Sequence, residues 1–207
     1  MKIVLIRHGQ TAANRDRRFL GRTDEPLTEE SRHDLAGRKY PQVRHLFSSP
    51  LLRCRQTAAI IYPDMESTVI DDLQEMDFGI FEGLNYQEMT GNAEYQKWVD
   101  GMCRGKCPGG ESMPEFVDRV FAAFDDAARE AIAAGEKQMF VAAHGGTVMA
   151  LLSRCGVPEK DYYDWFVKNG QGYVVHLDEK SWVNDPVLTA PVKFESLSAL
   201  PEERIVL

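Results

Sequence analysis

The sequence has few of the features that mark secreted, membrane-bound and metal-stabilised proteins. It has 4 cysteines in 207 residues, and only Cys103 and Cys107 lie close together, so neither a disulfide framework nor a paired zinc site is expected. The first hydrophobic run, residues 3–6, ends at Arg7 and is too short for a signal peptide or a membrane-spanning helix. These absences predict a cytoplasmic globular protein with reduced cysteines and no membrane contact.

Positive charge is also scarce, except at the start of the chain. The net charge is −8 at pH 7, which argues against nucleic-acid binding. Residues 1–22 nonetheless hold six basic residues against Asp16, a net charge of +5, which leaves −13 for the other 185 residues. A cationic zone on an acidic body suits a small anion better than a long polyanion. A solvated basic face explains the same charges, and both interpretations stay open.

Several nucleotide-binding, hydrolase and metal motifs are missing. The sequence has no G-x-x-x-x-G-K-[ST], no G-x-G-x-x-G after its first predicted strand and no G-x-S-x-G. It also lacks H-E-x-x-H, and neither His8 nor His144 has neighbours at metal-ligand spacing. The sequence therefore predicts no metal site and no cofactor.

Strand patterns alternate with helix patterns along most of the chain. Strands are predicted over residues 2–7, 45–48, 68–70, 138–143 and 173–177. Helices are predicted over residues 29–39, 50–62, 113–134 and 147–155, with short ones around 86–90 and 93–101; Thr28 is an expected N-cap, and Ser112 with Glu115 an expected capping box. This order predicts an α/β fold class, a three-layer α/β/α sandwich with a mostly parallel central sheet.

The chain shows no linker that would divide it, so residues 1–207 are predicted to form one domain. Residues 178–207 are a C-terminal extension whose structure the sequence does not assign. Two arrangements stay open for the extension: pairing between the subunits of a homodimer, or packing on its own domain.

Two of the predicted strands end in a histidine. His8 follows residues 2–7, and His144 follows residues 138–143. Ligands of such sheets bind beyond the carboxyl ends of the strands, so both imidazoles are expected at one site. For a lone histidine, a satisfied strand-end hydrogen bond is the simpler interpretation. With metal ligation disfavoured, a histidine nucleophile remains, in an anion pocket where Arg7, Arg53 and a charged His144 neutralise a phosphoryl group.

A departing alkoxide needs a proton, so a carboxylic acid is expected nearby. The loop over residues 73–83 offers Glu75, Asp77 and Glu82. A carboxyl beside the apolar residues of this loop is expected to have a raised pKa, as a general acid requires.

These residues fall within a set of motifs that resembles the histidine phosphatase superfamily, the phosphoglycerate-mutase-like proteins. The resemblance covers roughly residues 1–177. Its motifs are Arg7-His8-Gly9-Gln10-Thr11 with Asn14 and Gly21, Thr23-Asp24-x-Pro26-Leu27-Thr28, Ser48-Ser49-Pro50-Leu51-x-Arg53, Glu75-x-x-Phe78-Gly79-x-Phe81-Glu82-Gly83, Pro108-Gly109-Gly110-Glu111-Ser112 and His144-Gly145-Gly146.

The resemblance implies a role for each matching residue. His8 would be phosphorylated and Glu75 would be the proton donor, with no metal required. The phosphoryl group would be bound by Arg7, Arg53 and His144, and the residues expected to assist substrate binding are Gly9, Thr11, Asn14, Gly21 and Gly145. The expected partner is a small phosphorylated metabolite.

The branch of the family follows from length and local pattern. Glu75 and Ser112 are separated by 36 residues, whereas mutases of the family tend to be longer here. The chain most resembles α-ribazole phosphatase, which dephosphorylates α-ribazole 5′-phosphate in cobalamin assembly. Candidates for aromatic contacts to its planar base are Phe19, Phe81, Tyr95 and Trp98, although for any one of them a place in the hydrophobic core is the simpler interpretation. The alternatives are a broad sugar-phosphate or phosphoglycerate phosphatase, a phosphoglycerate mutase, and a non-catalytic phosphate-binding regulatory module.

Overall fold

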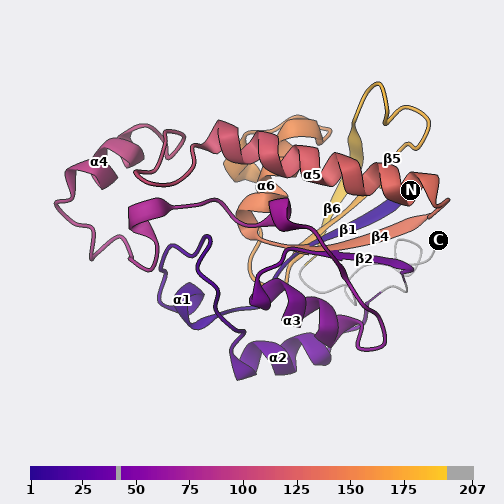
Figure 1. Ribbon diagram of the computed structural model, residues 1–207, viewed down its shortest axis with the longest axis horizontal. Helices are drawn as coiled ribbons and strands as arrows, with labels where there is room; N and C mark the ends of the chain where they lie inside the picture. The colour runs from indigo at the N-terminus through magenta and orange to yellow at the C-terminus, as the bar shows by residue number, and fades with distance from the viewer. Residues whose placement is uncertain (41–42, 195–207) are drawn as a thin grey trace.

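Six strands form one sheet in the computed structural model, which describes residues 1–40 and 43–194 (Figure 1). The order across the sheet is β3-β2-β4-β1-β5-β6. The strands are β1 (Lys2–Arg7), β2 (His45–Ser48), β3 (Thr68–Val69), β4 (Gln138–Ala143), β5 (Gly172–Leu177) and β6 (Leu188–Phe194). The helices are α1 (Ala12–Arg15), α2 (Glu29–Ala36), α3 (Leu52–Ile61), α4 (Ala93–Asp100), α5 (Met113–Ala133) and α6 (Gly145–Cys155), with short 3₁₀ turns η1 (Asp71–Leu73), η2 (Gly79–Phe81) and η3 (Tyr162–Trp165).

The first four strands along the chain run parallel. β1 and β2 both pair with β4, and β3 pairs with β2. On the other side of β1, β5 pairs antiparallel with β1, and β6 pairs antiparallel with β5. The prediction of a mostly parallel sheet is therefore confirmed. Arg7 lies opposite Ala143 in the β1–β4 ladder, so these strands end at the same level.

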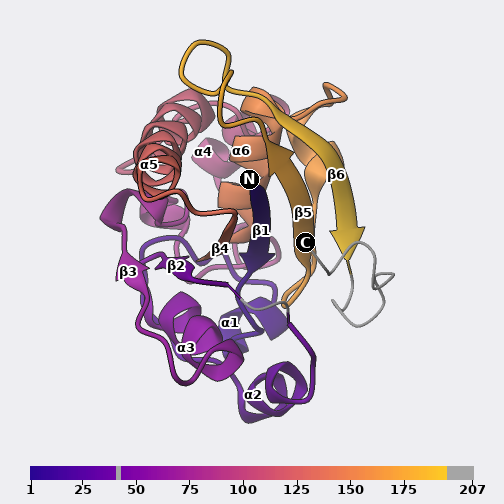
Figure 2. The same ribbon diagram turned by 90° about the vertical axis from the view of Figure 1, so that its right-hand side faces the viewer.

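Helices cover both faces of the sheet, which gives the predicted three layers. α5 and α6 lie on one face, and α2 and α3 lie on the other (Figures 1 and 2). Alternate residues of β1 serve the two faces: Ile3 and Leu5 pack in the cluster with α5 and α6, and Val4 and Ile6 pack in the cluster with α3. Burial on both sides is why the parallel strands are continuously apolar.

Helix boundaries follow the capping residues. The Thr28 hydroxyl accepts a hydrogen bond from the Ser31 amide, and Ser112 and Glu115 form the expected capping box of α5. Gly135, with a φ of 73°, follows α5 in a conformation that favours glycine. The N-cap predictions are confirmed.

Several predicted boundaries are wrong. α2 ends at Ala36, three residues early, α3 begins after Pro50 at Leu52, and α6 begins two residues early at Gly145. Residues 86–90 form turns in place of the predicted short helix. The short α1 was not predicted, because it is capped by Thr11 and Asn14 within four residues and has no apolar period.

β6 was not expected from the sequence. It lies antiparallel to β5 in the same chain, and Gly172 pairs with Phe194 at its end. Pro191 lies inside β6, which is at the edge of the sheet, where a missing backbone N–H is tolerated. Residues 195–207, the remainder of the C-terminal extension, lie outside the described part. Within the described residues, no helix is both long and apolar enough to cross a membrane.

Candidate active site

His8 follows β1 and is 3% exposed. Its Nδ1 lies 2.6 Å from the Gly9 carbonyl oxygen. A carbonyl can only accept, so Nδ1 carries the proton and Nε2 carries the lone pair of the neutral ring. Burial, together with the charges of Arg53 and Arg7, lowers the pKa of His8 well below its ordinary value. His8 is therefore a neutral imidazole with an unprotonated Nε2, and its Nδ1 acceptor is the Gly9 carbonyl that the sequence did not identify.

The residue after the histidine lies close to two side chains of α2. A Cβ on Gly9 would lie 2.5 Å from the Ser31 hydroxyl and 2.8 Å from a Leu35 methyl. The Gly9 N–H donates to the Thr57 hydroxyl at 3.0 Å, which ties this turn to α3. Close packing against α2 and α3 thus fixes the turn that carries His8.

His144 caps α6 and lies beside His8, with ring centroids 5.2 Å apart. Its Nδ1 accepts from Arg53 Nε at 3.3 Å, so its Nε2 carries the proton and donates to the Ser49 hydroxyl at 2.7 Å. Burial, with Arg53 and His8, lowers its pKa well below the ordinary value, so the expected charged His144 is a neutral ring here. A phosphoryl oxygen would reach either nitrogen only in exchange for one of these partners.

Two arginines lie close enough to His8 for their charges to act on its ring. Arg53, on α3, is 0% exposed and donates to the carbonyls of Gly21 and Thr23 at 2.7 and 2.8 Å. Arg7 donates from Nη1 to the Val167 carbonyl at 2.9 Å, while its buried Nε has no acceptor among residues 1–40 and 43–194. A buried donor without an acceptor costs about 1–3 kcal/mol. An oxyanion beside His8 would satisfy it.

Glu75 supplies a buried carboxyl to the same site and is 8% exposed. Its oxygens accept from the backbone N–H groups of Met76 at 3.0 Å and Gly146 at 2.8 Å. Burial raises its pKa above the ordinary value, against the opposing effect of these N–H groups and of Arg7 and Arg53. A group that ionises less readily than a free carboxyl is suited to donating a proton.

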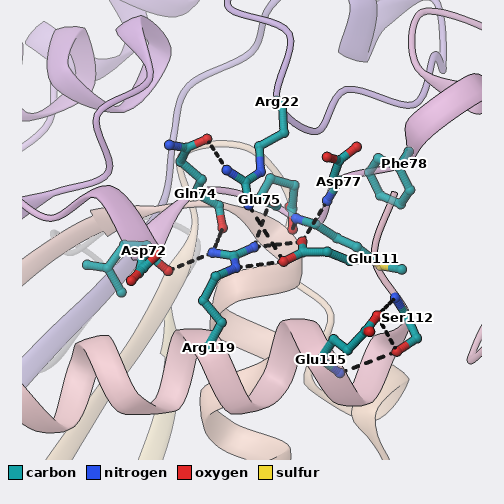
Figure 3. A network of polar contacts seen from close by, with 12 residues as sticks. Arg22, Asp72, Gln74, Glu75, Asp77, Phe78, Glu111, Ser112, Glu115 and Arg119 are labelled. Atoms are coloured by element: carbon teal, nitrogen blue, oxygen red, sulfur yellow. Dashed lines mark hydrogen bonds and ion pairs between the residues drawn. The ribbon is translucent and has the colours of Figure 1, made fainter. Parts of the chain in front are cut away.

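An arginine on α5 holds the loop that carries Glu75 (Figure 3). Arg119 donates to the carbonyls of Asp72, Gln74 and Glu75 at 2.7, 3.3 and 3.4 Å. Its guanidinium also pairs with both oxygens of Glu111 at 2.7 and 2.8 Å. The Glu75 backbone is thus fixed to a long helix.

The other two acidic residues of this loop serve the backbone. Asp77 accepts from the Gly79 N–H at 2.9 Å within its own turn. Glu82 accepts from the N–H groups of Arg22 and Thr23 at 2.7 and 2.8 Å, and so joins residues 78–83 to the segment that holds Arg53. Of the three predicted carboxyls, only Glu75 lines the cavity described below.

The five expected substrate-binding residues surround His8 in different ways. Gly9 holds the His8 ring, and Gly21 offers its carbonyl to Arg53. The Thr11 hydroxyl accepts from the Asn14 N–H as the cap of α1. Asn14 and Gly145 both line the cavity, and a Cβ on Gly145 would lie 3.3 Å from Arg7 Nε, so the glycine makes room for that guanidinium.

A cavity of about 280 Å³ opens next to Arg7 and Glu75. Six aromatic side chains are part of its lining: Phe19, Phe78, Trp98, Tyr162, Tyr163 and Phe166. Phe19 and Trp98 are where the sequence predicted aromatic contacts. Phe81 and Tyr95 are not in the wall: Phe81 is fully buried, and Tyr95 packs against it with ring centroids 5.6 Å apart. For these two residues the core interpretation is confirmed, and they are no longer candidates for contact with a base.

Sequence reasoning missed four residues that contact this site. Ser49 and Cys54 both touch the His144 ring, the Cys54 Sγ at 3.4 Å from Nε2. Arg119 supports the Glu75 loop, and Asn169 contacts the backbone of His8. Ser49 lay inside a quoted motif, but Cys54, Arg119 and Asn169 carried no local signal. All four cysteines are free, and in the described ranges no three His, Cys, Asp or Glu side chains gather as a metal site would require.

Substituting Gly146 tests the position of Glu75. A Cβ at Gly146 would lie 2.1 Å from Glu75 Oε1, so Gly146→Ala forces the carboxyl away. We expect kcat for an alkyl phosphomonoester to fall roughly 10- to 100-fold, a part of what a positioned general acid supplies. The measurement is steady-state hydrolysis, with Ser153→Ala on the same helix as control. An unchanged kcat in folded Gly146→Ala would contradict this placement of Glu75.

Comparison with known proteins gives one family. The model of the histidine phosphatase superfamily (branch 1) matches residues 3–187. A protein named "Probable phosphoglycerate mutase GpmB" from Escherichia coli O1:K1 is 32% identical over 211 residues, covering 86% of this chain and 95% of the relative.

Solved structures with the same fold carry two different names. The crystal structure of a phosphoglycerate mutase from Thermus thermophilus has a TM-score of 0.67 at 29% identity, covering 94% of this chain and 100% of its own. The α-ribazole phosphatase of Shigella flexneri has a TM-score of 0.74 at 24% identity, covering 87% and 92%. The Thermus structure thus shares the activity named for the sequence relative, and the Shigella structure is named for a different one.

Proposed function

Since the chain belongs to the histidine phosphatase superfamily, we propose that it hydrolyses a phosphomonoester through a phosphohistidine formed on His8. The observation that carries this proposal is the neutral His8 with its lone pair on Nε2, beside the unsatisfied Nε of Arg7 and the buried carboxyl of Glu75. Nucleophile, anion binding and acid are then provided by side chains alone.

The reaction runs in two displacements. His8 Nε2 forms a bond to phosphorus while the bond from phosphorus to the alcohol oxygen breaks, and protonated Glu75 gives its proton to that oxygen. Arg7 and Arg53 stabilise the charge on the phosphoryl oxygens. A water then attacks the phosphohistidine and gives a proton to the Glu75 carboxylate, which releases phosphate and restores both groups.

The lining of the cavity favours an alkyl alcohol that carries a planar aromatic group over phosphoglycerate. Arg7 and Arg18 are the cations among the described residues that line it. Arg18 is already paired with both oxygens of Glu88, at 2.6 and 2.9 Å, and Arg7 belongs to the phosphoryl site. A phosphoglycerate carboxylate would therefore lack a free cation, whereas the aromatic wall suits a planar base. This supports α-ribazole 5′-phosphate as the substrate.

Phosphoglycerate chemistry is the second candidate, and the sequence relative named as a probable phosphoglycerate mutase favours it. The experiment that tests both is a chelator-treated assay with p-nitrophenyl phosphate, α-ribazole 5′-phosphate and 3-phosphoglycerate. Phosphate release and formation of 2-phosphoglycerate are measured separately. We expect phosphate release, with the highest kcat/KM for α-ribazole 5′-phosphate. Formation of 2-phosphoglycerate would replace the hydrolase with a mutase, and no turnover would favour a binding module.

The cavity rim gives a prediction about specificity. Tyr163 is 42% exposed at the rim, so Tyr163→Ala removes aromatic surface without opening the core. We expect kcat/KM for α-ribazole 5′-phosphate to fall about 10-fold, the size of one aromatic contact, and that for 3-phosphoglycerate to stay within about 2-fold. Tyr86→Ala is the matched control, since Tyr86 is 52% exposed and lies outside the cavity. An equal loss of kcat/KM for both substrates would show that Tyr163 does not contribute to substrate specificity.

The two site pKa shifts predict the pH profile. Attack needs neutral His8, whose pKa is lowered, so activity rises with pH through a value well below the ordinary histidine range. Proton donation needs neutral Glu75, whose pKa is raised, so activity falls as pH increases through that value. Because these are the pKa shifts of the ligand-free protein, we expect kcat/KM to have its optimum on the acid side of neutrality. The pH profile of Glu75→Gln, measured with the same alkyl phosphomonoester as the wild type, should show no fall in activity at higher pH. A fall that persists in this variant would mean that another group titrates there.

A further inference from the structure

Asn169 lies between η3 and β5, in a segment that runs beside the turn carrying His8. Its Nδ2 lies 2.9 Å from Asn14 Oδ1, 3.2 Å from the His8 carbonyl oxygen and 3.3 Å from the Gly9 carbonyl oxygen. The neighbouring Gly170 N–H donates to the Arg7 and His8 carbonyls at 3.0 and 3.1 Å. Asn169 therefore contacts three groups around the proposed nucleophile.

Hydrogen bonds to the backbone determine the orientation of the Asn14 and Asn169 side-chain amides. Thr11 N–H can only donate and lies 3.3 Å from the Asn14 side chain, so the Asn14 atom facing it is the oxygen. The carbonyls of His8 and Gly9 can only accept, so the Asn169 atom facing them is the nitrogen. The two side chains consequently meet with the nitrogen of Asn169 against the oxygen of Asn14.

This orientation determines what Asn14 presents to an anion. With its oxygen occupied by Thr11 and Asn169, its two N–H hydrogens are left free, and Asn14 lines the cavity beside Arg7. In the described part of the chain, no protein acceptor lies within hydrogen-bonding distance of this nitrogen. A rotated Asn14 amide would instead turn a carbonyl oxygen toward the anion and repel it.

We propose that Asn169 is a positioning residue that holds the Asn14 amide with its N–H groups toward the phosphoryl site. The inference rests on the proposed function for the identity of the anion. Asn169 also shares the Gly9 carbonyl with His8 Nδ1, so the same side chain restrains the acceptor that sets the His8 tautomer. Asn169 itself does not contact the reacting atoms.

Orthovanadate binding tests the proposal without requiring turnover. Its affinity is measured by calorimetry for the wild type, Asn169→Ala, Asn14→Ala and the double variant. A hydrogen bond to a charged group is worth roughly 10-fold or more in affinity, so we expect Asn169→Ala to weaken binding by about 10-fold. Because Asn169 acts through Asn14, the same change in the Asn14→Ala background should weaken binding by less than about 3-fold.

A second substitution keeps the shape of the side chain. Asn169→Asp places an acceptor against three acceptors and favours the rotated Asn14 amide. The new charge repels vanadate both in the wild-type background and in the Asn14→Ala background. The difference between the two backgrounds, which is the loss of affinity seen only when Asn14 is present, therefore reports on the orientation of its amide. We expect that difference to be about 10-fold. Gln171→Glu adds the same charge two residues away, where the side chain bonds the Lys168 amide, and should show no such difference.

The outcomes separate the two proposals. Equal weakening in both backgrounds, or none in either, would overturn the role of Asn169, provided that melting curves show folded protein. Vanadate binding without hydrolysis by the wild type would overturn the proposed function and leave the role of Asn169 standing. A wild type that binds no vanadate would overturn both.

Discussion

His8→Ala is expected to lower the turnover of any phosphomonoester by about 10⁴-fold or more, because removal of a covalent nucleophile leaves only binding and charge stabilisation. The protein should remain folded. His8 is neutral. Within the part of the chain that the structure describes, it makes one side-chain hydrogen bond, to the adjacent Gly9 carbonyl, and contacts the His144 ring, so its removal breaks no ion pair and no hydrogen bond between distant elements there.

The measurements are phosphate release and intact mass of the wild type after an alkaline quench, which preserves phosphohistidine. Wild type mixed with substrate should show one added phosphoryl group, and His8→Ala none. His33→Ala, a change on the exposed face of α2, is the control for loss of a histidine. A His8→Ala protein that unfolds at ordinary temperature would show that the ring is structural, and one that turns over normally would move the nucleophile elsewhere.

Glu75→Gln is expected to slow hydrolysis of an alkyl phosphomonoester by about 10³-fold, within the usual range for a positioned general acid. The amide keeps the size of the side chain but has no proton to give to the alkoxide. Glu82→Gln should have a smaller effect, about 10-fold, because Glu82 acts through the Arg22 and Thr23 backbone that positions Arg53. The reverse ranking would make Glu82 the acid.

The leaving group sharpens this comparison. A p-nitrophenolate ion departs without a proton, so the first displacement in Glu75→Gln should be nearly normal with p-nitrophenyl phosphate. The second displacement still lacks its base, so a rapid burst of nitrophenol followed by slow turnover is expected. Rapid-mixing absorbance measures both phases. A burst-free slow reaction would mean that Glu75 acts on binding or on attack, not on proton transfer.

The placement of His8 and His144 at one site could be predicted, because it depends on the geometry of a parallel sheet, which the apolar pattern of the sequence indicates. Apolar runs ending in His8 and His144 predicted two parallel strands, and the in-register pairing of Arg7 with Ala143 brings those ends together. Arg7 and Arg53 were expected to bind the anion because they lie close in sequence to the ends of predicted strands, and the resemblance of the motifs gave them the same role. Their catalytic roles remain predictions that the variants above test.

The supporting residues could not be predicted, because each acts across a long stretch of chain. Asn169 meets Asn14 from 155 residues away, and Arg119 holds the Glu75 carbonyl from 44 residues away. Neither residue has a local pattern that distinguishes it from a surface polar group. The aromatic residues that line the cavity could be identified only in part, for a related reason. Irregular segments have no fixed period, so the sequence does not distinguish Phe81, which is buried, from Phe78, which lines the cavity.

The two halves of the cavity come from different parts of the chain, and this separation determines how the protein can change. The phosphoryl half is built where β1 and β4 end. The aromatic half takes Trp98 from α4, which stands apart from the sheet in Figure 1, and Tyr162 and Tyr163 from η3. The α4 segment contributes Trp98 and Cys103 to the cavity, and neither touches His8, Arg53 or His144 through a hydrogen bond. Changes at the exposed positions of this segment are therefore expected to alter the aromatic side of the cavity more than the residues around His8.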